Sequence, residues 1–209
     1  MKWIVTLTAM LLTACATQQP TGDGSINVSR LTELDNILRQ GQFQKLVVTL
    51  TPDKFDKDSY LLAHPSFSTD LLWLERNSNQ TYPPLLYVRA YRALRNDVEK
   101  AMELYAQARI LAFLDAKECR SATRFPWYSF LENTFPELHK ERKRNQMKYL
   151  NSVSETLRID SKATFRHSAS WYCGKNNLLP TKLAKAARKK KADSLFEYNE
   201  AKVRLGKDD

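Results

Sequence analysis

The sequence predicts an all-α protein, an irregular bundle in which helices form antiparallel pairs. Three observations support this class. Apolar residues recur three and four positions apart through most of the chain, which is the spacing of one face of an α-helix. Proline, asparagine, aspartate and glycine fall between these stretches, where helices begin and end. Segments that alternate apolar and polar residues, as half-buried strands do, are few.

The first predicted pair of helices follows a polar segment. Apolar residues at helical spacing begin after Ser29, which we expect to cap the first helix. Gly41 interrupts the pattern, and a second apolar stripe follows it. The two stripes consist of Leu31, Leu34, Ile37 and Leu38, and of Phe43, Leu46, Val47 and Leu50. This order predicts a helical hairpin.

Residues 51–68 hold Pro52 and Pro65 among polar residues, which favours a loop with a short helix near residues 60–63. A short helix over residues 69–76 follows, with Ser68 or Thr69 as its cap.

The strongest helical pattern covers residues 83–119. Pro83 and Pro84 suit the first turn of a helix, where the absent amide hydrogen is harmless, and this helix extends to about Arg95. Asn96 and Asp97 supply a turn and the cap of a second helix, which extends from residue 98 to about residue 119.

The last third of the chain begins with aromatic residues gathered between residues 125 and 135, near Pro126 and Pro136. We expect a helix over residues 137–157, an irregular segment over 166–174 and a final helix over 181–205.

The turn before residue 98 carries a resemblance to a known family of repeats. Asn96 to Ala101, followed by Leu104-Tyr105 and Ala108, resembles the second helix of tetratricopeptide and Sel1-like repeats. Gly41-Gln42-Phe43 resembles the same turn more weakly. The two turns are about 55 residues apart, whereas a regular array repeats about every 34. The resemblance implies one well-formed hairpin and one degenerate hairpin of a protein-binding repeat, and not a solenoid.

The N-terminus has the pattern of an export signal. Lys2 precedes about ten mostly apolar residues, too few to span a bilayer, which takes roughly twenty. Leu12-Thr13-Ala14-Cys15 resembles the lipobox of bacterial lipoproteins, which implies cleavage before Cys15 and acylation of that cysteine. Several acyl chains then anchor the protein to the membrane. The alternatives are a secretory signal cut after Ala14 or Ala16, or a cysteine buried in an apolar helix.

This interpretation divides the chain into a signal peptide (1–14), a flexible lipidated tether (15–29) and a helical periplasmic domain (30–209). The tether is polar and holds two of the five glycines, so it cannot repay the entropy of ordering. The second mature residue is Ala16 and not aspartate, which in this family implies the outer membrane.

Two thiols remain after lipidation, Cys119 and Cys173. In an oxidising compartment we expect them to form a disulfide that closes a loop of about 55 residues. Two separately buried thiols, or a metal site, are the alternatives. Removal of Lys2 with the signal leaves a net charge of about +9. The compartment argues against nucleic acid and leaves lipid head groups, wall carboxylates and acidic proteins as anionic partners.

No residue pattern indicates catalysis, a metal or another cofactor. His64, His139 and His167 are far apart and outside any metal-ligand motif, and the glycine-rich and nucleophile motifs of common enzymes are absent. A wall-cleaving enzyme would need a catalytic acid in a groove or a metal hydrolase site. The candidates, which we interpret as solvated helix charges, are Glu75, Glu118 and Glu132.

Two further segments allow two interpretations each. The run from Thr181 carries six cations and no acid, so it either binds an anionic membrane or acidic partner or forms a solvated helix face. Its cations are Lys182, Lys185, Arg188, Lys189, Lys190 and Lys191. A second group of residues is aromatic and forms either a recognition surface or, as we favour, core around the disulfide. It comprises Phe125, Trp127, Tyr128, Phe130, Phe135, Trp171 and Tyr172.

These observations predict an envelope lipoprotein, anchored through Cys15, that acts as a non-catalytic protein-binding module in a scaffold or assembly factor. An immunity protein against a periplasm-acting toxin and a cell-wall hydrolase are the alternative functions.

Overall fold

The computed structural model describes residues 26–51, 67–121, 126–162 and 168–205, and these ranges are all-α, without a β-strand. The first helices are α1 (Val28–Arg39), α2 (Phe43–Leu50), α3 (Phe67–Arg76), α4 (Pro83–Ala93) and α5 (Val98–Ala116). The remaining helices are α6 (Trp127–Thr134), α7 (Pro136–Arg144), α8 (Gln146–Lys162), α9 (Ser170–Cys173) and α10 (Thr181–Leu205), with a 3-10 turn at Lys175–Asn177.

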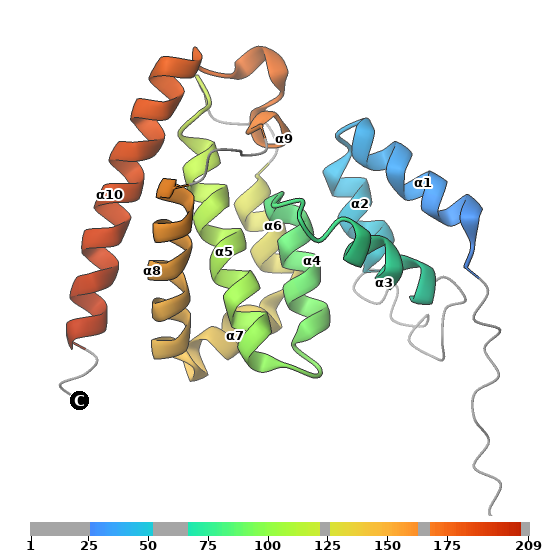
Figure 1. Cartoon of the computed structure of the whole chain (residues 1–209), viewed down its shortest axis with the longest axis horizontal. Coiled ribbons are helices and arrows are strands. Elements are labelled where there is room, and N and C mark those ends of the chain that lie inside the picture. Colours follow the sequence, from blue (N-terminus) through green and yellow to red (C-terminus); the bar gives the residue numbers. More distant parts are fainter. Residues whose placement is uncertain (1–25, 52–66, 122–125, 163–167, 206–209) are drawn as a thin grey trace, which may run out of the picture.

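Helices α1, α2 and α3 form one end of the molecule (Figure 1). The predicted hairpin of α1 and α2 is confirmed, and Gly41 takes a φ of 68° at its turn, a conformation that suits glycine. The cap of α1 differs from our expectation. Asn27, and not Ser29, accepts the amide hydrogen of Arg30 at 3.0 Å, because α1 begins at Val28.

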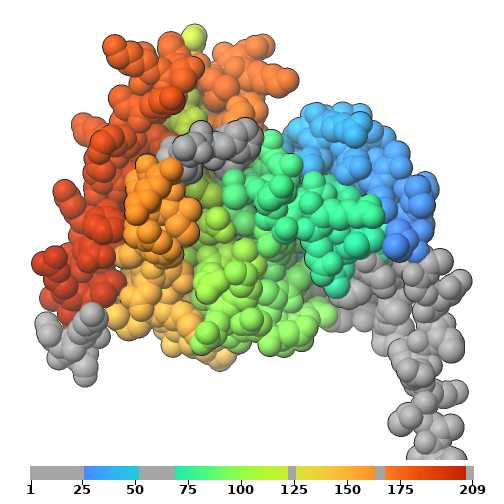
Figure 2. Space-filling model, viewed as in Figure 1, coloured from blue at the N-terminus to red at the C-terminus, as the bar shows by residue number. Residues whose placement is uncertain are grey.

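The predicted pair α4 and α5 is confirmed, and it forms the centre of the bundle. Two prolines begin α4, and the Asp97 carboxylate caps α5 by accepting the amide hydrogen of Lys100 at 2.9 Å. The two helices share a core in which the rings of Tyr87 and Tyr105 meet edge to face, with centroids 5.5 Å apart. Helix α8 packs on α5, and α10 packs mainly on α8 (Figures 1 and 2).

Two predictions for the last third of the chain were wrong. The helix expected over residues 137–157 is two helices, because Asn145 leaves the helical conformation (φ −117°, ψ 45°) and its side chain donates to Glu141 at 2.5 Å. The segment over 166–174, expected to be irregular, contains the short helix α9, and the aromatic residues before Pro136, for which no secondary structure was predicted, form α6. Pro136 begins α7 directly after Phe135, so α6 and α7 meet without a loop.

Helix α10 is the longest described helix and has a narrow buried face, made of Ala184, Arg188 and Asn199. In the described part of the chain, no helix combines the length and apolar character that crossing a membrane requires.

Candidate functional site

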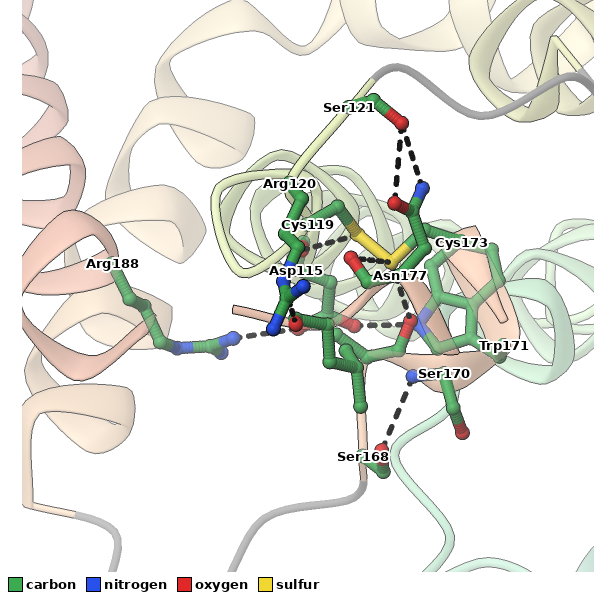
Figure 3. The surroundings of a disulfide bond; sticks show 12 residues. Asp115, Cys119, Arg120, Ser121, Ser168, Ser170, Trp171, Cys173, Asn177 and Arg188 are labelled. Carbon is green, nitrogen blue, oxygen red and sulfur yellow. Dashed lines mark hydrogen bonds and ion pairs between the residues drawn. A yellow bond between two sulfur atoms is a disulfide. The ribbon is translucent and has the colours of Figure 1, made fainter. Parts of the chain in front are cut away.

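The structure joins Cys119 and Cys173 in the predicted disulfide, with Cα atoms 6.1 Å apart. The bond links the turn after α5 to the end of α9 (Figure 3). Backbone hydrogen bonds on both sides of it reinforce the link, from Arg120 to Asn177 at 2.8 Å and from Leu179 to Glu118 at 2.8 Å.

Three of the six described residues in the aromatic group are core, which is the interpretation we favoured. Trp127, Phe135 and Trp171 are buried, and the rings of Trp127 and Trp171 are 5.3 Å apart. Phe130 and Tyr172 are half-buried beside these two rings, and half-buried Tyr128 lies against Phe113 instead. Phe125 lies outside the described residues.

Arg188 corrects the predicted basic surface. Its side chain is 3% exposed, because it points inward from α10 and binds carboxylates of α5 and α8. Asp115 accepts from Arg188 Nη1 at 2.6 Å and Asp160 accepts from Nη2 at 2.7 Å. Glu118 accepts from Nη1 at 2.8 Å. Asp115 also accepts from the indole of Trp171 at 2.6 Å, so this network reaches the disulfide segment (Figure 3).

The other cations of that run remain on the surface of α10. Lys182, Lys185, Lys189 and Lys190 are exposed and Lys191 is half-buried. Lys189 pairs with Asp193 at 2.7 Å, so acids share this surface with the lysines. Cys15, His64 and His167 lie outside the described residues.

The three glutamates named as candidates stand in different surroundings. Glu75 is exposed on α3, and Glu118 is bound to Arg188. Glu132, on α6, is no solvated helix charge. Its side chain is 14% exposed and pairs with Arg109 of α5 at 3.2 Å.

A polar network surrounds Glu132 and Arg109. Tyr87 donates its hydroxyl hydrogen to Glu132 at 2.6 Å, and Tyr105 donates to the same carboxylate at 2.8 Å. Arg109 donates to the hydroxyls of Tyr149, at 2.9 Å, and Tyr128. Its guanidinium carbon also lies within 6 Å of the centres of the rings of Tyr105, Tyr128 and Tyr149.

Burial and charge shift the titration of this network. Burial, and then the charge of Glu132, raises the pKa of Tyr87 and of Tyr105 well above the ordinary value for tyrosine. Burial lowers the pKa of Arg109, but Tyr149 and Glu132 raise it by more, so the guanidinium stays charged. The charge of Arg109 is thus balanced by one carboxylate, and Nη1 and Nη2 donate to tyrosine hydroxyls, whereas Nε makes no hydrogen bond to a described residue.

His139, the one described histidine, lies beside this network. Its Nδ1 is 3.2 Å from Nη2 of Arg142 and 3.6 Å from Glu132. With Nδ1 unprotonated, the imidazole accepts from Arg142, which orients that guanidinium at the end of α7.

A pocket of about 420 Å³ adjoins the network. Three cations line it besides Arg109, namely Arg142 and Lys143 of α7 and Lys202 of α10, and no carboxylate is among its lining residues. Its apolar lining comes from α5, α8 and α10 and consists of Ile110, Phe113, Leu150, Val153 and Leu195. Two aromatic side chains in the lining are exposed, Phe113 by 37% and Tyr198 by 63%.

The chain holds this pocket in shape. Asn199 is 3% exposed and donates to the Leu150 carbonyl and to Ser154, both at 2.8 Å, which fixes α10 against α8. The cations rest on rings of the lining, with Arg142 5.5 Å from the centre of Tyr149 and Lys202 5.8 Å from the centre of Tyr198. The charges of Arg142 and Lys202 are therefore placed before any ligand arrives.

A larger pocket of about 780 Å³ lies between α5 and α8, but both signs of charge line it, including Lys100, Glu103, Lys148 and Glu155. It has no preference for one sign of partner. We therefore take the smaller pocket as the candidate site and call it the basic pocket.

Sequence reasoning missed the basic pocket because its residues come from three distant parts of the chain. One signal was present. Arg109 stands four residues after Tyr105 and four before Phe113, so the three side chains lie along one face of a helix and its neighbours on that face are aromatic. A cation on such a face indicates a buried polar partner or a site.

No protein-family model, curated protein or solved structure matches this chain.

Proposed function

We propose that the mature protein is an outer-membrane lipoprotein, anchored through Cys15 and facing the periplasm, that binds an acidic protein partner without catalysis. The observation that carries the binding role is the basic pocket, where three cations and two exposed aromatic residues surround an apolar floor. Arginine and aromatic side chains are enriched at protein interfaces.

Other features support the cellular setting. The disulfide suits an oxidising compartment, and the N-terminal pattern ending at Cys15 resembles a lipobox. The excess of positive charge attracts an acidic partner over a long range and accelerates encounter. The likeness of residues 96–108 to a tetratricopeptide or Sel1-like hairpin is in keeping with a binding role.

The anchor is tested by metabolic labelling with fatty acid. Wild-type protein is expected to take up label, and Cys15→Ser is expected to remain as unlabelled precursor. Retention of label by Cys15→Ser would refute the lipid anchor.

The binding role is tested by crosslinking the native lipoprotein in its own envelope, followed by purification in detergent and mass spectrometry. We expect one acidic protein in stoichiometric amount, and its identity separates a scaffold from an immunity protein. Recovery of the lipoprotein alone would contradict the binding role.

A further inference from the structure

We propose that the basic pocket binds a peptide segment of the partner in which a carboxylate side chain stands next to a large apolar one. This inference rests on the proposed function and names the chemical group that the pocket recognises. The carboxylate meets the cationic rim, and the apolar neighbour enters the floor.

The charge of the rim determines the sign of the ligand. Among the described residues, no carboxylate forms an ion pair with Arg142, Lys143 or Lys202. The charge of Arg109 is already balanced by Glu132. The pocket therefore presents about three uncompensated positive charges, and an anionic ligand gains their attraction while displacing no internal partner.

The guanidinium of Arg142 determines the geometry at the rim. Its Nη2 faces His139 at 3.2 Å and its carbon lies over Tyr149, which holds its plane in place. A planar guanidinium matches the two oxygens of a carboxylate, whereas a lysine acts as a point charge. Lys143 and Lys202 then add charge from α7 and α10.

The floor requires an apolar group beside the anion. Ile110, Leu150 and Val153 are already buried, so the apolar surface that a small free anion would leave hydrated belongs to half-buried Leu195 and to exposed Phe113 and Tyr198. The volume of about 420 Å³ is near the lower end of the range for ligand pockets. It fits an apolar side chain next to an acidic one, which a peptide supplies.

The test measures binding of fluorescein-labelled peptides to the full mature lipoprotein in a neutral detergent. The probes alternate glutamate with phenylalanine, leucine or valine, and matched probes carry glutamine in place of glutamate. The glutamate probes are expected to bind, and the glutamine probes are expected to bind at least about tenfold more weakly.

Variants locate the binding. The double variant Lys143→Gln and Lys202→Gln is expected to weaken the glutamate probes about tenfold. Lys182→Gln with Lys190→Gln removes the same charge from the exposed surface of α10 and is expected to change affinity less than about twofold. Urea unfolding of both variants shows that each is folded.

Several results would overturn the inference. These are no binding of the glutamate probes, equal weakening by both double variants, or preference for phosphatidylglycerol micelles over every peptide. The last result identifies an anionic lipid as the ligand. If the envelope crosslinking recovers a partner that Lys143→Gln with Lys202→Gln still retains, this inference fails while the proposed function stands.

Discussion

Two of the inward-facing arginines among the described residues, Arg188 and Arg109, have different surroundings. Arg188 lies among three carboxylates, from Asp115, Glu118 and Asp160, and its side chain is 3% exposed. Arg109 lies among tyrosines with one carboxylate, and its side chain is 11% exposed. Carboxylates around Arg188 lock α5, α8 and α10 together. Beside Arg109, the other cations of the basic pocket have no carboxylate partner among the described residues. Arg188 thus serves cohesion, whereas the cations beside Arg109 form a charged surface.

The largest expected effect is at Arg188. Arg188→Met is expected to lower the free energy of unfolding by about 3–5 kcal/mol, because buried Asp115 and Asp160 lose their cation. Urea unfolding followed by circular dichroism measures this loss. Lys190→Met, on the exposed side of the same helix, is the control and is expected to cost less than about 0.5 kcal/mol. A similar cost for both variants would show that the ion pairs of Arg188 do not hold α10.

The disulfide belongs to the cohesive region around Arg188. It closes a loop that contains α6, α7 and α8. Replacing both cysteines, Cys119→Ser with Cys173→Ser, is expected to cost about 2–4 kcal/mol, since the unfolded chain regains its entropy. Urea unfolding with and without a reductant gives the value. Alkylation of two thiols in the denatured, unreduced mature protein would contradict the bond itself.

The network around Arg109 is tested by substituting its carboxylate partner, Glu132. Glu132→Gln keeps the shape and an acceptor for the tyrosines but removes the charge facing Arg109. We expect a loss of about 1–3 kcal/mol at neutral pH, less than at Arg188. Urea unfolding measures the loss, and a loss as large as that of Arg188→Met would remove the distinction between the two networks.

The pH dependence of the free energy of unfolding gives an independent test of the Glu132 network. Burial and then Glu132 raise the pKa of Tyr87 and Tyr105 in the folded protein. Above about pH 10 the unfolded chain loses these protons first, so the free energy of unfolding falls as the pH rises. The fall is expected to be shallower in Glu132→Gln, measured by urea midpoints at several values between about pH 9 and pH 11. Equal slopes would contradict the part played by Glu132.

The sequence predicts neither the Arg188 network nor the Arg109 network, although it predicts the helices around them well. The spacing of apolar residues located the pair α4 and α5, and the two cysteines identified the disulfide. Arg188 was read as surface because five other cations surround it in sequence. The carboxylates that bury it stand up to 73 residues away. The break at Asn145 was missed because α7 and the start of α8 are polar and offer little apolar periodicity.

The smallest expected effect concerns the rim of the basic pocket. Lys143→Gln with Lys202→Gln is expected to change the free energy of unfolding by less than about 0.5 kcal/mol per residue, because neither lysine has a carboxylate partner among the described residues. Urea unfolding beside Lys182→Gln with Lys190→Gln provides the measurement. A loss above about 2 kcal/mol would show that the rim lysines stabilise the fold, as Arg188 does, and that the two regions do not differ in this way. If the free energy of unfolding is unchanged, any loss of peptide binding does not come from loss of the fold. The two lysines then contribute charge for a partner and little to the stability of the protein.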